Sequence, residues 1–441
     1  MSSDATLTHG GKRLATYQHR TLITDARVVS CSGDVTEHPF DGDLLIEGEH
    51  IAQVFRGRAP IDRGSVQEID IAGATVMPGL CDAHVHISWP LDFVFDHPGV
   101  VAMPDDAHAL EVAGVVRTFL ASGYTLLVGA GTLKPRIDVI IQRAIDRGLI
   151  PGPRLWPSGE HITQRGGIGA GSAVEADGAE EVRRLVGEQC ELGVRSIKLM
   201  ISGDGIVPGH PSQTTYMDDA MVAAAVREAE ANGAFITVHA RSTEGVRMAV
   251  RNGVRIIHHA TYLNDAAISE LSAARDDVWV CPGLHYLRAM VEGDAQPYGV
   301  SPESVERALY PQELQAAVDG LRKLHSNGVR IVAGGDFGHQ WTRHGTYAAE
   351  LASYVDLLGF SPLESLLTAT SNAGPLVGER LGQIREGYLA DLVVVDGDPT
   401  VDIRVLLDPD RVGPVIKGGQ PALVGWGEVE RWARSRPAAS V

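Results

Sequence analysis

Hydrophobic and polar residues follow two different rhythms along the chain. From about residue 21 to 71, apolar segments such as TLITDARVVS and GDLLIEGEHIAQVF are separated by Gly, Asp and Pro, which is typical of short strands and turns. From about residue 76 to 376, an apolar strand is followed by a polar loop, a helix, a Gly and another strand. In the clearest example, the amphipathic segment AEEVRRLVGEQCELG ends at Gly193 and VRSIKLMISG follows as a strand. After about residue 381 the β pattern returns in GQIREGYLADLVVVDGDP.

The repeated helix-Gly-strand unit predicts parallel strands joined by helical crossovers. Eight such strands can be counted: GLCDAHVHI, GYTLLVGAG, PRLWPSGEH, VRSIKLMISG, AFITVHA, VRIIHHA, VWVCPGLHY and VRIVAGGD. Eight strands in about 300 residues favour a closed (β/α)8 TIM barrel over an open doubly wound sheet. We therefore predict an α/β fold with this barrel over residues 76–380. Residues 1–75 and 381–441 are expected to pair as a small β-sandwich domain formed by both termini.

Composition and charge narrow the possible partners. Hydrophobic residues make up 44% of the 441-residue chain, which is ordinary for a soluble globular protein. The net charge of −18 and the absence of a basic run disfavour nucleic acid and anionic membranes as partners. The start, MSSDATLTHGGKRLA, has no apolar signal-peptide region, and no window is apolar enough to span a membrane, so we expect a cytoplasmic protein. The four cysteines form no CxxC pair and predict neither disulfides nor a thiolate metal site.

Polar residues that could carry chemistry lie at the ends of the predicted strands. The stretch VMPGLCDAHVHI places His84 and His86 on one strand face with Asp82, because side chains alternate along a strand. Barrel enzymes have their active sites at the C-terminal ends of the strands. Four further strands carry the other candidates at or near their ends: Lys198, His239, His259 and Asp336.

Each of these residues taken alone has an ordinary structural explanation. A single His at a strand end is more often a hydrogen-bonded core residue than a ligand, and a lone Lys can extend its ammonium to the barrel rim. The combination is harder to explain, because burying all these groups without partners would cost on the order of several kcal/mol for each. A divalent cation held by neutral imidazoles and a carboxylate removes that cost. The set therefore predicts a metal site.

The motifs at these strand ends together resemble the amidohydrolase superfamily of metal-dependent hydrolases. The resemblance is to the subgroup with imidazolonepropionase-like and Xaa-Pro dipeptidase (prolidase-like) members, and it extends to phenylurea and ochratoxin hydrolases. It runs from about residue 22 to 418 and rests on VMPGLCDAHVHI, GYT, GLIPGPRL, IKLM, VHA, IIHHA, GGDF and GQIREGYLADLVVVDGDP. These motifs are specific for the superfamily but say little about the substrate.

The resemblance implies a role for each candidate. His84 and His86 would bind the more buried of two divalent ions, and His239 and His259 the more exposed one. Lys198 would be carboxylated by CO2, and the carbamate would bridge both ions, because a bare ammonium has no lone pair to offer a metal. Asp336 would bind the first ion and shuttle protons. The implied reaction is hydrolysis by a hydroxide that bridges the two ions. Zn is the expected metal, although Mn, Co and Fe accept the same ligands.

Several positions depart from the pattern of the superfamily. His258 stands where relatives often have Glu, and GGI at residues 166–168 stands where they commonly have GGH. TLLVG replaces TTVRD in the second strand, and GGD replaces GTD in the last. None of these changes removes an expected ligand, but several alter positions beside the site, which suggests a specialised substrate. The roles of His258 and His344 are left open.

Candidate substrate contacts lie in the loops beyond the strand ends. They are His161, Arg241, Tyr262, His285 and Tyr286. His161 could hydrogen-bond a substrate carbonyl, and Arg241 could pair with a carboxylate. For each of them a solvated loop position is the alternative explanation.

The main functional prediction is hydrolysis of an amide-type C–N bond in a small molecule. The bond could belong to an N-acyl amino acid or dipeptide, an aryl amide, a carbamate or a urea. The first alternative is a metal-dependent decarboxylase of aromatic acids, a lyase, and the second is a barrel scaffold without catalysis. Retention of all six expected ligands favours the hydrolase. The resemblance also implies a homo-oligomer, the usual assembly in this superfamily.

Overall fold

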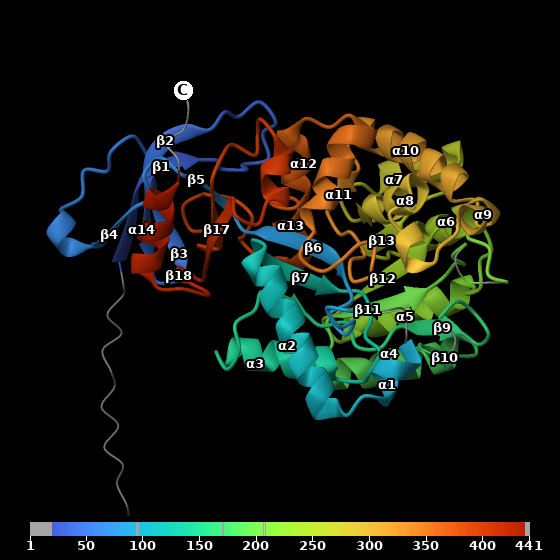
Figure 1. The fold of residues 1–441 in the computed structure, drawn as a ribbon. Coiled ribbons are helices and arrows are strands. Elements are labelled where there is room, and N and C mark those ends of the chain that lie inside the picture. The colour runs from blue at the N-terminus through green and yellow to red at the C-terminus, as the bar shows by residue number, and fades with distance from the viewer. Residues whose placement is uncertain (1–19, 94–96, 170–171, 206, 208, 437–441) are drawn as a thin grey trace, which may run out of the picture.

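The computed structural model describes residues 20–93, 97–169, 172–205, 207 and 209–436. Two bodies of structure are visible in Figure 1: a sheet built from both ends of the chain, and a larger body of parallel strands surrounded by helices. The mixed α/β class with parallel sheets is therefore confirmed. Within the described residues, no helix is both long and apolar enough to cross a membrane.

Strands from both ends of the chain hydrogen-bond in one eight-stranded sheet. The order is β18-β17-β16-β5-β1-β2-β3, with β4 paired to β1. Its strands are β1 (Arg20–Val28), β2 (Phe40–Glu47), β3 (His50–Arg56), β4 (Gln67–Asp70), β5 (Thr75–Pro78), β16 (Leu392–Val395), β17 (Val412–Lys417) and β18 (Gln420–Pro421). The helix α14 (Trp426–Ser435) contributes Val429 and Ala433 to the apolar core of this sheet. The predicted pairing of the terminal segments is thus present, whereas the sandwich form and the domain boundaries stay predictions.

The central strands form two parallel sheets. The smaller has the order β6-β7-β8 and the larger β10-β9-β11-β12-β13-β14-β15. Their bounds are β6 (Leu80–Val85), β7 (Tyr124–Gly129), β8 (Arg154–Trp156), β9 (Ile162–Gln164), β10 (Val174–Ala176), β11 (Ser196–Met200), β12 (Phe235–Ala240), β13 (Ile256–His259), β14 (Trp279–Cys281) and β15 (Arg330–Ile331). All eight predicted strands are present, while β9 and β10 were not expected.

Backbone hydrogen bonds connect the two parallel sheets at both edges. Ala83 N donates to Ala333 O over 2.8 Å, and Arg195 N donates to Pro157 O over 2.9 Å. These contacts bring the segment after β15 beside β6, and the segment before β11 beside the end of β8. The carboxyl ends of strands far apart in sequence therefore lie close together.

Helices cover the outside of the parallel strands (Figure 1). They are α1 (His97–Ala102), α2 (Asp105–Ala121), α3 (Ile137–Asp146), α4 (Ala179–Leu192), α5 (Asp219–Ala231), α6 (Thr243–Arg251), α7 (Asp265–Ala273), α8 (Leu284–Glu292), α9 (Pro302–Arg307), α10 (Tyr310–Ser326), α11 (Ala348–Ser353), α12 (Pro362–Thr368) and α13 (Ala373–Val377). Short helical turns lie at η1 (Arg63–Ser65), η2 (Gln296–Tyr298), η3 (Tyr354–Leu358) and η4 (Ile403–Leu407).

Local signals in the sequence explain where several helices begin and end. Gly193 ends α4 with a φ of 106°, a conformation that glycine adopts without strain, so the predicted stop is confirmed. Ser242 caps α6 by accepting a hydrogen bond from Gly245 N. A full capping box, formed by Ser361 and Glu364, begins α12.

Candidate active site

The carboxyl ends of the parallel strands surround a cavity of about 360 Å³. All six of the expected metal ligands line it: His84, His86, Lys198, His239, His259 and Asp336. They come from β6, β11, β12 and β13, and from the segments that follow β6 and β15. The fold therefore brings together every residue that the strand-end pattern singled out.

His86 is oriented by a backbone oxygen. Its Nδ1 lies 3.1 Å from Gly131 O, which can only accept, so the hydrogen is on Nδ1 and Nε2 carries the lone pair when the ring is neutral. That Nε2 lies 3.2 Å from Asp336 Oδ1. The Nε2 atom of His84 lies 3.6 Å from the same oxygen. The two histidines of the stretch VMPGLCDAHVHI thus converge on one carboxylate.

Lys198 lies at the centre of the histidine cluster. Its side chain is buried, and its Nζ lies 3.4 Å from His84 Nε2 and 2.5 Å from His258 Nδ1. Burial lowers the pKa of Lys198 to about 7, with the positive charge of Arg241 acting in the same direction and Asp336 opposing it. A substantial fraction of this lysine is therefore a neutral amine near neutral pH.

His239 and His259 face one another from adjacent strands, with ring centroids 4.5 Å apart. His239 Nε2 lies 3.0 Å from Gly203 O, which accepts its hydrogen and leaves the lone pair on Nδ1. Burial, together with the charge of Arg241, lowers the pKa of His239 to about 4 and that of His259 well below its ordinary value. Both rings are therefore neutral and able to donate lone pairs.

Asp336 follows β15 and is held in an unusual backbone conformation. Its φ is 56°, and that of His259 is 70°, values that cost non-glycine residues strain and cluster at functional sites. Burial alone would raise the pKa of Asp336, but the hydrogen bond and positive charge that His86 supplies when its ring is protonated, with smaller contributions from His339 and Lys198, hold it below its ordinary value. The side chain is therefore an ionised carboxylate.

The donor set matches the chemistry of a divalent cation. His84, His259 and Asp336 offer ligand atoms that all lie within 4.8 Å of one another. The buried Nδ1 atoms of His84 and His259 have no hydrogen-bond partner among the described residues. Buried imidazole nitrogens normally have partners, so neutral rings beside an ionised carboxylate fit a metal ion better than a plain core.

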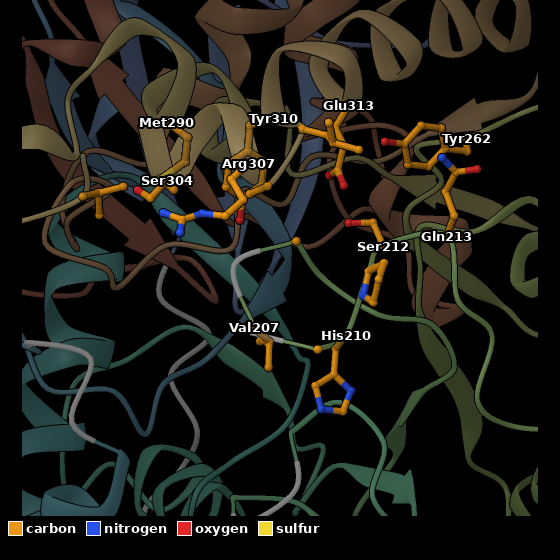
Figure 2. A pocket seen from close by; sticks show the side chains of 16 residues that line it. Val207, His210, Ser212, Gln213, Tyr262, Met290, Ser304, Arg307, Tyr310 and Glu313 are labelled. Atoms are coloured by element: carbon orange, nitrogen blue, oxygen red, sulfur yellow. The ribbon is translucent and has the colours of Figure 1, made fainter. Parts of the chain in front are cut away.

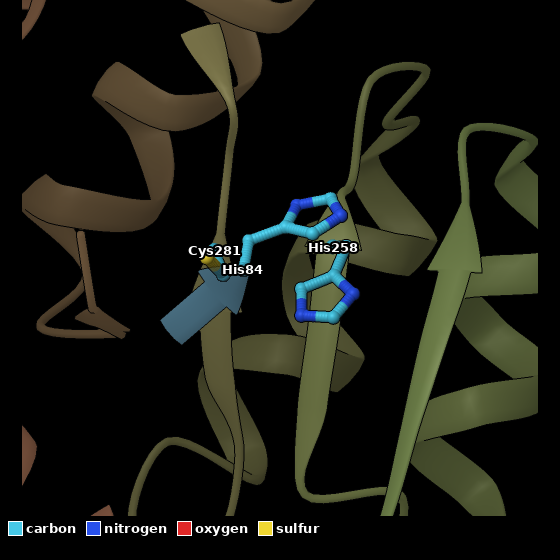
Figure 3. Close-up of side chains that lie close together, drawn as sticks. All are labelled: His84, His258 and Cys281. Atoms are coloured by element: carbon cyan, nitrogen blue, oxygen red, sulfur yellow. The ribbon is translucent and has the colours of Figure 1, made fainter. Parts of the chain in front are cut away.

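A second group, His84, His258 and Cys281, also lies within metal-binding range (Figure 3). Its geometry has an explanation without an ion. His258 stacks on His84 with centroids 3.9 Å apart, and its Nε2 lies 3.2 Å from Ala83 O while its Nδ1 faces Lys198. Burial raises the pKa of Cys281 well above its ordinary value, and its sulfur lies 3.6 Å from Gly334 O, so a hydrogen-bonded thiol accounts for this group without an ion. His258, whose role the sequence left open, supports His84 and Lys198.

The expected substrate contacts are distributed over several environments. His161 and Tyr286 line the cavity, and burial lowers the pKa of His161 to about 3, so its ring is neutral. His285 is not among the described lining residues; its backbone N donates to Glu350, and its ring lies beside Phe337. Tyr262 lines a different, neighbouring cavity.

Arg241 lies behind the cavity wall rather than in it. The side chain is fully buried, and its Nε donates to Asp204 Oδ2 over 2.9 Å. Its Nη1 lies 3.5 Å from Glu313 Oε2 and 3.4 Å from Thr261 Oγ1. Asp204 itself lines the cavity, so Arg241 reaches the site through this carboxylate.

Several lining residues were not anticipated from the sequence. They include Trp89, His97, Asp204 and His339. Trp89 stacks on His86 with centroids 4.2 Å apart, and it follows that histidine by three positions, as His339 follows Asp336. A position three residues after an expected metal ligand could thus have predicted that Trp89 and His339 line the cavity.

One departure from the superfamily pattern, Ile168, and one residue whose role the sequence left open, His344, border the same site. Ile168, the apolar residue of the GGI departure, lines the cavity. His344 lies behind it, with Nε2 3.2 Å from Trp89 O and Nδ1 3.2 Å from the Tyr347 hydroxyl, so it holds the loop that carries Trp89.

Comparisons with known proteins identify the family of this chain. A family model described as the amidohydrolase family matches residues 75–422. Ochratoxinase from Aspergillus niger is 28% identical over 391 residues, covering 81% of this chain and 78% of that protein. A solved prolidase in complex with N-methylphosphonate-L-proline is 29% identical, with a TM-score of 0.80, and the match covers 91% of this chain and 99% of that one.

A solved Xaa-Pro dipeptidase with bound methionine gives a similar result. It is 25% identical with a TM-score of 0.77, covering 91% of this chain and 99% of that one. The family match spans the parallel strands and four strands of the terminal sheet, β5, β16, β17 and β18, and it includes every strand end that lines the cavity. The chain therefore belongs to the amidohydrolase family and is a hydrolase that acts on carbon–nitrogen bonds.

Proposed function

We propose that the protein is a metal-dependent amidohydrolase that cleaves an amide-type C–N bond in a small molecule. The observation that carries this proposal is the convergence of His84, His86, Lys198, His239, His259 and Asp336 on one cavity. We also infer that the two parallel sheets form a closed (β/α)8 barrel, an inference supported by the hydrogen bonds that link their edges.

We expect two divalent ions, with zinc as the default metal. His84, His86 and Asp336 would hold one, and His239 and His259 the other. When bound, such ions supply positive charge that lowers the pKa of water and polarises a carbonyl. Lys198 suits the bridging role, because a pKa of about 7 leaves enough neutral amine to add to CO2, as an ammonium cannot.

Asp336 is the proposed proton carrier. As water adds to the scissile carbonyl carbon, the ionised carboxylate takes a proton from it, and on cleavage of the C–N bond it delivers that proton to the leaving nitrogen. His161 lines the same cavity with a neutral ring, and we propose that it hydrogen-bonds the carbonyl oxygen of the substrate. General acid–base help of this kind contributes roughly 10²- to 10⁴-fold in rate.

The substrate class follows from the walls of the cavity. Trp89, Leu133, Ile168 and Met200 provide apolar surface beside the charged ligands. We propose an N-acyl amino acid or dipeptide, an aryl amide, a carbamate or a urea whose apolar part packs on these side chains. The names of the relatives, which include ochratoxinase and prolidases, support amide-type substrates. The decarboxylase considered from the sequence would need only a single ion, such as one held by His84, His259 and Asp336, and the test below separates it from the hydrolase. We still expect the protein to be cytoplasmic, to form a homo-oligomer and to bind neither nucleic acid nor membranes.

The test combines metal content with a hydrolysis screen. Protein purified without chelator and supplied with bicarbonate is expected to hold about two ions per chain and to release amine from one of these substrate classes. His259→Asn is expected to lose metal and activity, whereas His325→Asn, on the distant helix α10, keeps both. CO2 release from aromatic acids without amine release would favour the lyase, and a metal-free, inactive wild type would contradict both.

A further inference from the structure

A second cavity adjoins the candidate active site, and the proposed reaction does not use it. Its volume is about 650 Å³. It lies between the loop after β11 and the helices α8, α9 and α10 (Figure 2). Val207 lines both this cavity and the first, so the two share a wall. We call it the Glu313 cavity, after the buried acid in its lining.

Glu313 is an unusual group to find in such a wall. It lies in the first turn of α10, and its side chain is only 1% exposed. Its Oε2 forms no well-aligned hydrogen bond with the described residues: Arg241 Nη1 lies 3.5 Å from it, and the Ser212 hydroxyl interacts with the carboxylate. In Figure 2 its carboxylate lies on the same side of the cavity as Ser212 and Tyr262. A buried carboxylate with only a long contact to its cation is costly, and a ligand that supplies a closer donor would lower that cost.

The nearby charges do not balance. Arg241 is the cation beside Glu313, but its closer contact is with Asp204, 2.9 Å away against 3.5 Å for Glu313. One guanidinium therefore faces two carboxylates, one of which also accepts from the Tyr310 hydroxyl, so a negative charge remains at the cavity wall when Glu313 is ionised. Burial, opposed by Arg241, raises the pKa of Glu313 to about 7, as expected for a carboxylate that lacks a full partner.

The rest of the lining is suited to an apolar body. Val207, Met290 and Leu309 contribute aliphatic surface, and Tyr262 and Tyr310 contribute rings. Arg307 also lines the cavity, but it is exposed and forms no ion pair with Glu313 among the described residues. The unbalanced charge is therefore negative at the buried end, next to apolar walls.

We propose that the Glu313 cavity binds an organic cation, a primary ammonium on an apolar or aromatic body, with the ammonium donating to the Glu313 carboxylate. An ammonium brings both the missing hydrogen-bond donor and the missing positive charge. The proposal goes beyond the proposed hydrolysis and does not depend on it, because binding can be measured without turnover.

Benzylamine is a suitable probe, with benzyl alcohol as its neutral counterpart. Calorimetric titration of the full-length protein at pH 8, where Glu313 is ionised, is expected to show at least tenfold tighter binding of benzylamine. Glu313→Gln keeps the shape of the side chain but removes its charge, and it is expected to abolish this preference. Glu306→Gln removes an exposed carboxylate on α9 outside the lining and is expected to bind as wild type does.

Two further variants locate the binding. Ser304→Phe fills the cavity without altering its charges and is expected to weaken benzylamine binding, which keeps the test open if Glu313→Gln does not fold. Asp336→Asn changes only the first cavity and is expected to leave the preference intact. The proposal is overturned if wild type does not distinguish the amine from the alcohol, if Glu313→Gln still does, or if Asp336→Asn alone removes the preference.

Discussion

Replacement of Arg241 by Met is expected to destabilise the folded protein severely. Arg241 is fully buried and contacts Asp204 at 2.9 Å and Glu313 at 3.5 Å. Methionine fills a similar volume but leaves both carboxylates without their cation. At an effective dielectric constant of about 20, each pair is worth roughly 5 kcal/mol of gross attraction. The desolvation of the guanidinium, which the variant avoids, offsets much of that sum.

The net loss expected for Arg241→Met is about 3 to 5 kcal/mol, the usual cost of removing one partner from a buried ion pair. Urea unfolding at pH 8, followed by circular dichroism, measures it. Glu313→Gln in the Arg241→Met background should recover part of the loss, because it removes one of the two stranded charges. A loss below about 1 kcal/mol, or no recovery in the double variant, would refute the idea that Arg241 neutralises these carboxylates.

Three further predictions concern the same network and the candidate active site. Since the pKa of Glu313 is raised to about 7 in the folded protein, the stability that its proton contributes is lost as the pH rises through 7. The free energy of unfolding of Glu313→Gln, measured with urea, should therefore rise relative to that of wild type between pH 5 and pH 8, by at most about 3 kcal/mol. A difference that does not change with pH contradicts this. His258→Ala should lower metal affinity about 10- to 100-fold and reduce the carbamate signal of Lys198 in ¹³C NMR with labelled bicarbonate, whereas His325→Ala should change neither. Asp336→Asn should lower kcat by about 10²- to 10⁴-fold with little change in KM, and an unchanged kcat would exclude Asp336 as the proton carrier.

The sequence identified the strands and the residues at their ends because both depend on local pattern. Short apolar runs of strand length, flanked by Gly and rich in β-branched residues, favour strands, and all eight predicted parallel strands are present. Once those strands are parallel, their carboxyl ends must meet. That is why His84 and Asp336, far apart in the chain, could be assigned to one site before any contact was known.

Tertiary structure alone decided what the remaining polar groups do. Arg241 looked like a substrate contact because it lies two positions beyond His239, yet its partners Asp204 and Glu313 come from other segments and turn it inwards. The role of His258 could not be assigned from the sequence either, because its stacking partner His84 lies on another strand, β6, while His258 lies on β13. Strand periodicity fixes which face a side chain takes, but its partners depend on how loops and helices pack, which no local pattern records. The sequence by itself therefore determined the fold class and the candidate metal ligands, while the charge balance behind them and the second cavity arose only from packing.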